Sequence, residues 1–277
     1  MNLNFPKISI ITVSYNSILE IENTILSVIN QDYPNIEYII IDGGSTDGTV
    51  DVIKKYSSRI SKWISEPDKG IYDAMNKGIK LATGEWVTMR NCGDYFAERD
   101  SLSKLFAEPV EDSVDFVCGG AYRTMELGYH IVYSKDITKN NYRMSVIHPA
   151  TFVRTTWHKQ YLFDTRFRVG ADYNLIFNSV KFGKKFVFRD IPIVIFPSGG
   201  YSSIHWDQGK REGLITRGLY NTTFQKIKGE LYIFRLKFNY YFRKVFKMIP
   251  FIKKKRDSIL ISRLNIKPLP LPLKKFY

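Results

Sequence analysis

The sequence lacks the features of a secreted or membrane-spanning protein. Its 277 residues include two cysteines, Cys92 and Cys118, which are too few for a disulfide framework and suit a reducing compartment. There is no run of 18 apolar residues, so we expect no helix that spans a membrane. The first apolar segment, residues 8–13, follows no basic stretch, is short for a signal peptide and is interrupted by Ser9 and Thr12. These absences predict a cytoplasmic protein.

The sequence also lacks the common loops that bind nucleotide phosphates. Neither G-x-G-x-x-G nor G-x-x-x-x-G-K-S/T follows the first predicted strand, residues 8–14. The glycine-rich segment DGGSTDG, residues 42–48, begins with a carboxylate that would repel a phosphate. A carboxylate in that place suits a nucleobase N–H or a ribose hydroxyl better.

Acidic residues are scarce at the end of the chain. The net charge is +14, and residues 226–277 hold 15 Lys and Arg against 2 Asp and Glu, whereas residues 1–225 hold 26 against 25. A nearly neutral body therefore carries a basic tail that needs its own explanation. With 44% hydrophobic and 15% aromatic residues, the chain can bury a substantial core.

The first 97 residues alternate between strand and helix patterns. Strands are predicted at residues 8–14, 36–41, 62–65 and 86–89, and helices at residues 19–29, 49–56 and 71–81. This alternation predicts a doubly wound, mostly parallel α/β sheet with right-handed crossovers. A further strand is expected at residues 115–120 and an edge strand at residues 128–134, with no chemistry assigned to either.

Polar loops follow the carboxyl ends of three predicted strands. They begin at Tyr15, at Asp42 and at residues 91–94 (NCGD), and in an open α/β sheet they lie along one edge, where ligands bind. Asp42 and Asp94 are therefore expected to face one crevice. A lone carboxylate such as Asp94 suits Mg2+ or Mn2+ that substrate phosphates also hold. The alternative is that each Asp only forms a turn, because Asp and Gly favour turns.

Four segments in order resemble the motifs of family 2 glycosyltransferases of the GT-A fold. They are residues 10–16 (IITVSYN), 42–49 (DGGSTDGT), 73–78 (DAMNKG) and 91–94 (NCGD). Residues 163–175 are similar to the acceptor side of bacterial members, whose catalytic base lies in a Glu-Asp-x-x-Leu-like pattern. The resemblance covers about residues 6–205. It implies a GT-A enzyme of bacterial polysaccharide synthesis.

The resemblance implies a nucleotide-sugar site. Asp42 is similar to a carboxylate that contacts the nucleobase, typically uracil, and Val13 and Tyr15 would line the base pocket. Asp94 resembles the last Asp of the D-x-D-type metal motif, which implies a divalent cofactor, Mn2+ or Mg2+. Lys77 lies near the place of a basic residue that faces the diphosphate in relatives.

The resemblance also implies that Asp172 is the catalytic base. A single base opposite the leaving group implies one in-line displacement and inversion at the anomeric carbon. The alternative for Asp172 is a helix cap, because an apolar-rich helix pattern follows it. The chain departs from the family pattern in three places. The metal motif has one carboxylate, Ala171 stands where relatives have Glu, and Arg90 stands where they often have an apolar residue.

Other polar residues are candidates for the acceptor side. His148 is either structural or in contact with the acceptor or diphosphate. Residues 199–203 (GGYSS) are predicted to form a mobile loop that closes over the donor, as lids do. Ser202, Ser203 and His205 are the candidate contacts in that loop.

From Thr222 the tail predicts a basic amphipathic helix that ends at Pro250. The apolar residues that recur at helical spacing are Ile227, Leu231, Phe234, Phe238, Phe242, Val245 and Ile249. Residues 253–256 (KKKR) follow, and residues 268–272 (PLPLP) are expected to be extended. Such a helix either lies on an anionic membrane surface or packs on the catalytic domain. Nucleic acid is not expected as a partner, because the tail contains no recognisable nucleic-acid module.

Together these patterns predict two parts. Residues 1–221 form the GT-A domain, with a nucleotide-sugar-binding half (6–97) and an acceptor half (98–221), and residues 222–277 form the basic extension. The predicted function is metal-assisted, inverting transfer from a nucleotide sugar, with UDP as carrier, to a hydroxyl of a polysaccharide or lipid-linked saccharide at the inner face of the plasma membrane. The alternatives are a nucleotidyltransferase, which should carry a basic triphosphate loop, and a catalytically silent membrane-associated scaffold.

Overall fold

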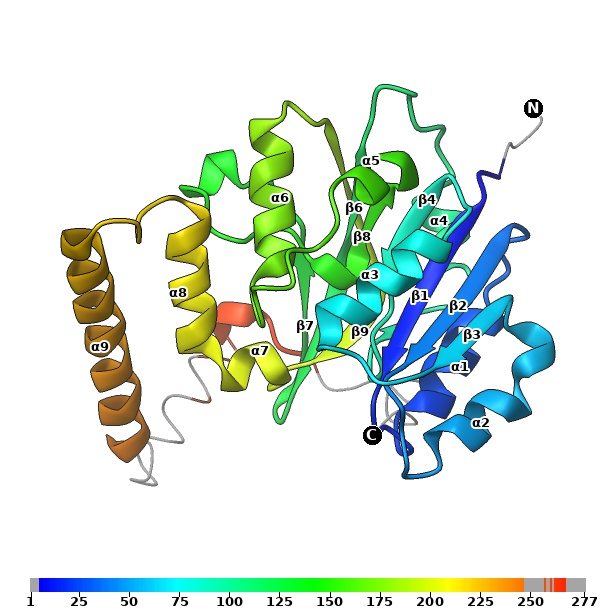
Figure 1. Ribbon diagram of the computed structural model, residues 1–277, viewed down its shortest axis with the longest axis horizontal. Coiled ribbons are helices and arrows are strands. Elements are labelled where there is room, and N and C mark those ends of the chain that lie inside the picture. Colours follow the sequence, from blue (N-terminus) through cyan, green and yellow to red (C-terminus); the bar gives the residue numbers. More distant parts are fainter. Residues whose placement is uncertain (1–4, 247–256, 258–259, 261, 268–277) are drawn as a thin grey trace.

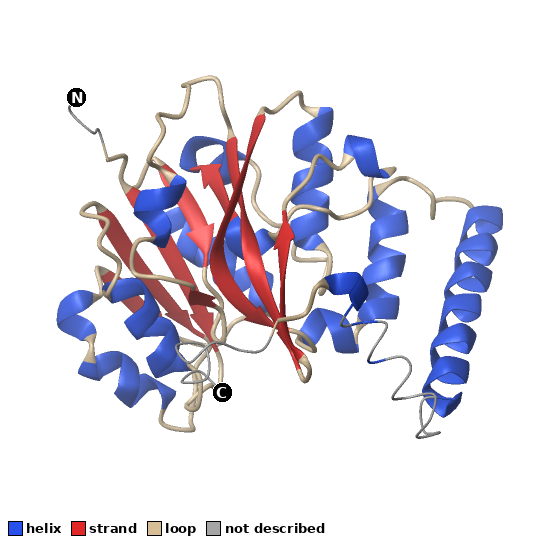
Figure 2. Cartoon of the chain, turned by 180° about the vertical axis from the view of Figure 1, so that it is seen from behind, coloured by secondary structure: helices blue, strands red, loops and turns tan. Residues whose placement is uncertain are grey.

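The computed structural model describes residues 5–246, 257, 260 and 262–267 (Figure 1). In this part of the chain the strands are β1 (Ile8–Ser14), β2 (Ile36–Asp42), β3 (Lys62–Ser65), β4 (Trp86–Met89), β5 (Tyr95–Phe96), β6 (Phe116–Met125), β7 (Gly128–Tyr133), β8 (Thr151–Arg154) and β9 (Phe186–Pro197). They form one sheet in the order β3-β2-β1-β4-β8-β6-β9-β5, and β7 pairs with β6 (Figure 2).

The first half of the sheet is parallel. Strand β1 pairs with β2 and β4, and β2 pairs with β3, all in the parallel sense. All seven residues of β1 are buried, as expected for a β-branched strand covered on both faces. The register places Ser14 opposite Asp42 and Asp42 opposite Ser65, so three strands end together at one edge.

The second half of the sheet adds antiparallel pairs. Strand β8 runs antiparallel to β4 and to β6. Strand β7 pairs antiparallel with β6, and β5 pairs antiparallel with β9. Strands β6 and β9 pair in the parallel sense. The sequence analysis anticipated the strands at β6 and β7 but not β8 or the twelve-residue β9. The predicted doubly wound α/β fold class is confirmed.

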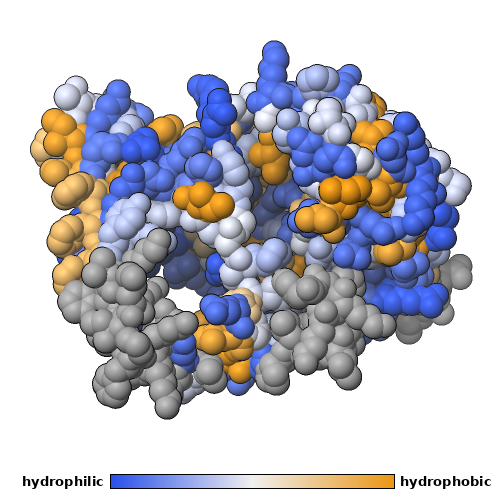
Figure 3. Space-filling model, turned by 90° about the horizontal axis from the view of Figure 1, so that it is seen from below, coloured by the Kyte–Doolittle hydropathy of each residue, from blue (hydrophilic) through white to orange (hydrophobic). Residues whose placement is uncertain are grey.

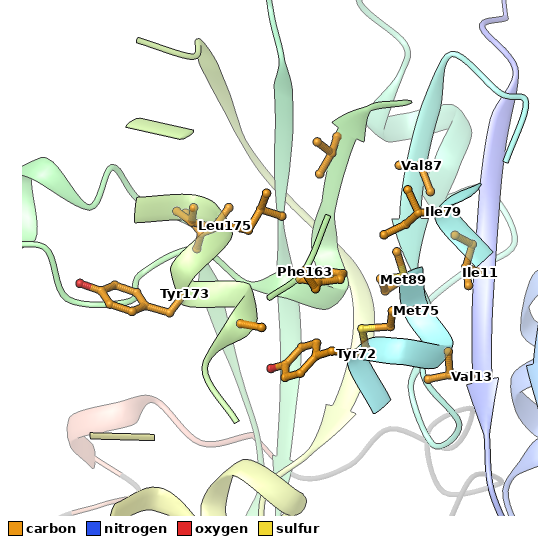
Figure 4. Close-up of a cluster of buried hydrophobic side chains, with 14 of the residues drawn as sticks. Ile11, Val13, Tyr72, Met75, Ile79, Val87, Met89, Phe163, Tyr173 and Leu175 are labelled. Atoms are coloured by element: carbon orange, nitrogen blue, oxygen red, sulfur yellow. The ribbon is translucent and has the colours of Figure 1, made fainter. Parts of the chain in front are cut away.

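Helices cover both faces of the sheet. They are α1 (Ile21–Ile29), α2 (Thr49–Lys55), α3 (Ile71–Leu81), α4 (Ser101–Leu105), α5 (Thr155–Gln160), α6 (Ala171–Lys181), α7 (Tyr201–Ile204), α8 (Trp206–Thr216) and α9 (Thr223–Phe246). One apolar cluster joins α1, α2 and α4 to the sheet, and the other joins α3 and α6 to the opposite face (Figure 4). Helices α3 and α6 both begin at the edge where β1 and β2 end (Figure 1).

The region after β9 differs from the prediction of a mobile loop. Residues 201–216 form α7 and α8, and α8 packs between α6 and α9 (Figures 1 and 2). The buried carboxylate of Glu212 fixes α8 to the loop before α6.

Helix α9 packs on the domain by one side and exposes the other. Ile233 is 2% exposed, and ion pairs of Arg211 with Glu230 and of Lys237 with Asp207 join α9 to α8. The residues of the predicted apolar face that the structure describes are all exposed: Ile227, Leu231, Phe234, Phe238 and Phe242. Figure 3 shows apolar surface along the left side of the molecule, where α9 lies in Figure 1.

Some parts of the predicted tail are not described. The structure does not describe the side chain of Val245. Outside the described residues lie Ile249, Pro250, residues 253–256 and residues 268–272. Beyond α9, Tyr129 of β7 and Lys267 exchange two backbone hydrogen bonds as an isolated antiparallel bridge. No helix among the described residues is long and apolar enough to cross a bilayer.

Candidate active site

The turn that carries Asp94 is fixed to β1 and α1. The N–H groups of Arg90 and Cys92 donate to carbonyls of β1, and the N–H of Gly93 donates to the Thr24 hydroxyl on α1. Gly93 has φ +92°, a left-handed conformation that side chains disfavour. The turn closes through a hydrogen bond from Asp94 N–H to the Asn91 carbonyl. Asp94 therefore lies at the carboxyl edge of the sheet, as predicted.

A buried arginine lies behind Asp94. Burial raises the pKa of Asp94 to about 7, and the charge of Arg90 partly offsets that rise. The Arg90 guanidinium is fully buried, lies 4.0 Å from the centre of the Phe96 ring and donates from Nη1 to the Pro149 carbonyl at 2.8 Å. Its Nε and Nη2 have no hydrogen-bond partner among the described residues. A positive charge is thus built into the site.

The Asp94 turn fits a divalent ion that a substrate also holds. Asn91 Oδ1 is buried and has no hydrogen-bond partner in the described part of the chain, so it offers a second oxygen on the same turn as the Asp94 carboxylate. The described residues contain no group of three or more His, Cys, Asp and Glu that could hold a metal by themselves. One carboxylate and one amide oxygen match Mg2+ or Mn2+ whose other ligands are phosphate oxygens and water.

Asp42 organises the loops instead of facing the crevice. Its side chain is fully buried, and its oxygens accept five hydrogen bonds, from Ser14, Ser65, the Gly44 N–H and both groups of Ser45. Burial alone would raise the pKa of Asp42, but these hydrogen bonds outweigh it and lower the pKa. The predicted contact between Asp42 and a nucleobase does not fit this position, because no oxygen is free to meet a ligand.

Two other predicted donor-site residues also have different surroundings. Val13 is buried in the apolar cluster between β1 and α3 and faces the core (Figure 4). Lys77 Nζ forms ion pairs of 2.6 Å with Asp68 and 2.7 Å with Glu66, which raise its pKa. The ammonium group on α3 is therefore neutralised by the loop that precedes this helix and does not stand free for a diphosphate.

Tyr15 is exposed at the position predicted for it. Its side chain is 65% exposed and borders Gly43, where an added Cβ would lie 3.2 Å from the Tyr15 ring and 3.2 Å from Asp68 Oδ2. Burial raises the pKa of Asp68, and Lys77 partly offsets the rise. The aromatic ring of Tyr15 and the Asp68 carboxylate therefore meet beside Gly43.

Asp172 lies in the first turn of α6. Gly170 is the N-cap residue of this helix, so Asp172 does not occupy the cap position itself. Asp172 Oδ1 accepts a hydrogen bond of 2.7 Å from the Tyr173 N–H. Burial raises the pKa of Asp172 to about 6, and the nearby charge of Glu212 adds to the rise. Such a carboxylate is mostly ionised at neutral pH and can accept a proton.

Glu212 positions the loop before Asp172, and the sequence analysis missed it. Its carboxylate is buried and accepts hydrogen bonds from the N–H groups of residues 168–170, at 2.7–3.0 Å. Tyr72 of α3 holds the same loop by donating to the Val169 carbonyl at 2.7 Å. No local pattern identifies Glu212, because its partners lie more than 40 residues away in the sequence.

Asp172 lines a large cleft. This acceptor-side cleft has a volume of about 850 Å3 and is bordered by α6, α8, α9 and residues 140–144. Ser202 also lines it, so the structure brings Asp172 and Ser202 together. A second cleft of about 320 Å3 lies between the start of α3 and the loop before α6, and Lys69 and Arg168 line it. Asp94 lines neither of these two clefts.

The remaining predicted residues are not among those that line the cleft around Asp172. His148 begins a short 3-10 helix (His148–Ala150), and its ring packs edge-on against Phe163. Burial and the charge of Arg90 lower the pKa of His148 to about 4, so it is neutral at physiological pH. Ser203 is exposed, and the His205 ring packs 4.2 Å from the ring of Tyr201.

The fold and the site at its carboxyl edge define a GT-A glycosyltransferase. The chain belongs to glycosyl transferase family 2, whose family model matches residues 9–191. It is 28% identical over 191 residues to the PGL/p-HBAD biosynthesis glycosyltransferase of Mycobacterium bovis, over 61% of this chain and 68% of that one. It is 37% identical over 114 residues to the putative teichuronic acid biosynthesis glycosyltransferase TuaG of Bacillus subtilis, over 40% of this chain and 45% of that one.

Solved structures agree on the fold. S. aureus TarS 1-349 in complex with UDP-GlcNAc is 18% identical with a TM-score of 0.61, over 78% of this chain and 67% of that one. The same fragment with UDP matches over 66% of its length. The mannosyltransferase PcManGT from Pyrobaculum calidifontis, in complex with GDP-Man and Mn2+, is 19% identical with a TM-score of 0.59, over 82% of this chain and 70% of that one.

Proposed function

We propose that this glycosyltransferase moves a sugar from a uridine diphosphate sugar to a hydroxyl group of a saccharide acceptor, with inversion at the anomeric carbon. The observation that carries the proposal combines two facts. The Asp94 turn follows the carboxyl end of β4, which runs parallel to β1. Helix α6, with Asp172 in its first turn, begins toward the same end of the sheet (Figure 1). Similar structures that contain UDP, UDP-GlcNAc or GDP-Man with Mn2+ support a nucleotide-sugar donor.

On the donor side, Asp94 and Asn91 Oδ1 would hold Mg2+ or Mn2+ together with the diphosphate. When bound, the ion supplies Lewis-acid stabilisation of the charge that develops on the leaving diphosphate. Tyr15 offers an exposed ring for the base, and the Asp68 carboxylate beside Gly43 takes over the base contact that the sequence suggested for Asp42. Arg90 adds a fixed positive charge behind Asp94.

On the acceptor side, Asp172 would act as the base. Its carboxylate accepts the proton of the acceptor hydroxyl while the hydroxyl oxygen attacks the anomeric carbon. The bond from that carbon to the diphosphate oxygen breaks, and the diphosphate leaves with the electron pair. A base with a pKa of about 6 is ionised at neutral pH and can accept this proton in the transition state.

We also propose that α9 brings the enzyme to the inner face of the plasma membrane, where a polysaccharide precursor linked to lipid would be its acceptor. Phe234 and Phe238 are 68% and 61% exposed, and Lys228 and Arg235 are also exposed on α9. An aromatic face flanked by basic residues suits an anionic lipid surface.

A donor screen tests the proposed function. The full-length protein is incubated with a panel of UDP- and GDP-sugars, Mn2+ or Mg2+ and an alkyl-linked saccharide, and released nucleoside diphosphate is measured. We expect metal-dependent release with at least one UDP-sugar. Consumption of a nucleoside triphosphate with release of pyrophosphate would instead favour a nucleotidyltransferase. The absence of any consumption, with alkyl- and lipid-linked acceptors supplied, would favour a silent scaffold.

A further inference from the structure

The acceptor-side cleft carries an excess of positive charge. Arg143, Lys210 and Arg217 line it, against the single carboxylate of Asp172. None of these three cations forms a salt bridge with another described residue, although Arg211 and Lys237 nearby are paired with Glu230 and Asp207. Among the described residues, two cations near the cleft are therefore neutralised, while the three that line it have no ion-pair partner.

The three cations come from different segments and surround one space. Arg143 lies on residues 140–144, Lys210 on α8 and Arg217 at the end of α8. Arg217 is half-buried, and its charge acts on Tyr173 at the start of α6. Like charges repel one another in an empty cleft, and a bound anion relieves that repulsion. Guanidinium groups in particular form two parallel hydrogen bonds with a phosphate.

The rest of the lining suits sugar rings. The aromatic side chains are Tyr142, Tyr173, Trp206 and Tyr232. Each combines a flat apolar surface with a polar group that can form hydrogen bonds. Gly209 and Gly213 of α8 face the cleft without side chains, and an added Cβ at Gly213 would lie 3.7 Å from the Tyr173 ring. A volume of about 850 Å3 leaves room for several such rings.

We propose that this cleft binds an acceptor saccharide that carries a phosphate or diphosphate group. Arg143, Lys210 and Arg217 contact the phosphate oxygens, while Asp172 receives the proton of the acceptor hydroxyl. This inference rests on the proposed function and adds the chemical class of the acceptor to it. A phosphate with a charge of about −1.5 to −2 balances the two net positive charges of the lining.

Two sources of such a group are a lipid diphosphate and a phosphate on a soluble saccharide. Helix α9 links the cleft to the first source, because Tyr232 and Leu236 line the cleft while Phe234 and Phe238 are exposed on the same helix. A saccharide held by a membrane lipid could therefore reach the cleft while α9 lies on the membrane.

Calorimetry with three probes tests the inference on the full-length protein. The probes are octyl β-N-acetylglucosaminide, the same sugar joined to the octyl chain through a diphosphate, and soluble N-acetylglucosamine 1-phosphate. We expect the diphosphate-linked probe to bind at least about tenfold more tightly than the neutral glycoside. Equal binding of the two phosphate-bearing probes would identify a soluble source, and preference for the octyl-linked one a lipid source. Both results support the phosphate site.

Charge variants locate the site. R143Q/R217Q and K210Q should each lower affinity for the phosphate-bearing probes about tenfold and leave that for the neutral glycoside unchanged. K80Q is the matched control, because Lys80 is exposed on α3 and does not line the cleft. Thermal melting checks that each variant is folded.

Unchanged affinity in R143Q/R217Q and K210Q, or a wild-type protein that binds the neutral glycoside as tightly as the phosphate-bearing probes, would overturn the inference. Binding of UDP with Mn2+ is measured in parallel. If the protein binds and turns over a donor but does not distinguish the probes, only this inference fails. If it neither binds nor consumes a nucleotide sugar, the proposed function fails.

Discussion

At the scale of single residues, the two carboxylates of the proposed mechanism have pKa values near neutral pH. Burial raises the pKa of Asp94 to about 7 and that of Asp172 to about 6. Arg90 offsets the first rise, and Glu212 adds to the second. Groups with such pKa values exchange a proton or a cation near physiological pH, which is typical of functional sites.

Replacing Asp172 by Asn should remove transfer and keep donor binding. The amide cannot accept a proton, so we expect the rate of transfer to fall by about 10^2- to 10^4-fold. The wild-type rate should rise with pH through about 6, because only the ionised carboxylate is active. Initial rates from pH 5 to 8 and calorimetry with the donor measure both effects. Equal transfer rates in the variant and the wild type would show that Asp172 is not the catalytic base.

Replacing Asp94 by Asn should abolish the gain in donor affinity that Mn2+ provides. In the wild type this gain should decrease as pH falls below about 7, because a protonated carboxyl group does not hold a cation. Donor titrations with Mn2+ and with a chelator, at pH 6 and 8, measure the gain. Binding with the chelator serves as the control and should be similar in both proteins. A metal-dependent gain that survives in D94N would show that the ion is held elsewhere.

At the scale of elements, α8 fixes the start of α6. Glu212 reaches from α8 to three backbone N–H groups, and Tyr72 reaches from α3 to the same loop. Asp172 follows this loop directly, so the position of the proposed base depends on two helices other than its own. A buried carboxylate that accepts hydrogen bonds from several N–H groups contributes strongly to the stability of the fold, because its removal leaves those donors unpaired.

Replacing Glu212 by Ala should lower the free energy of unfolding by roughly 1–3 kcal/mol, the cost of leaving buried donors unpaired. E230A is the control, since Glu230 forms a partly exposed pair whose loss should cost about 1 kcal/mol or less. The negative charge of Glu212 raises the pKa of Asp172. Because E212Q lacks this charge, we expect its transfer rate to increase at a lower pH than that of the wild type. Denaturant unfolding and rate–pH profiles measure these effects. An unshifted profile would limit Glu212 to a structural role.

At the scale of the whole molecule, the main feature is the position of α9 beside the sheet and its other helices. The sheet and its helices form one body, and α9 lies at its side (Figure 1). On α9 the aromatic residues Phe234 and Phe238 and the basic residues Lys228 and Arg235 are exposed. The inner side of α9 borders the acceptor-side cleft. One helix therefore connects the proposed membrane surface with the proposed acceptor site.

Replacing Phe234 and Phe238 together by Ser should weaken binding to vesicles that contain phosphatidylglycerol by about tenfold or more, because two large apolar side chains no longer enter the interface. F182S is the control, since Phe182 is also exposed but lies after α6. Flotation with anionic and neutral vesicles measures the effect. Unchanged flotation of the double variant would exclude α9 as the membrane contact, and a change in oligomeric state would point to a second copy of the chain instead.

The sequence by itself determined the parallel half of the fold and the location of Asp94 and Asp172. Alternating strand and helix patterns are local, because each depends on the spacing of apolar residues within one element, and strand ends place the polar loops. Only the tertiary structure decided what each loop residue faces. Asp42 is enclosed by three serines and a loop, Lys77 pairs with Asp68 and Glu66, and Glu212 holds a distant loop. Hydrogen bonds and ion pairs between distant segments exist only once those segments pack together, so no local pattern could assign them.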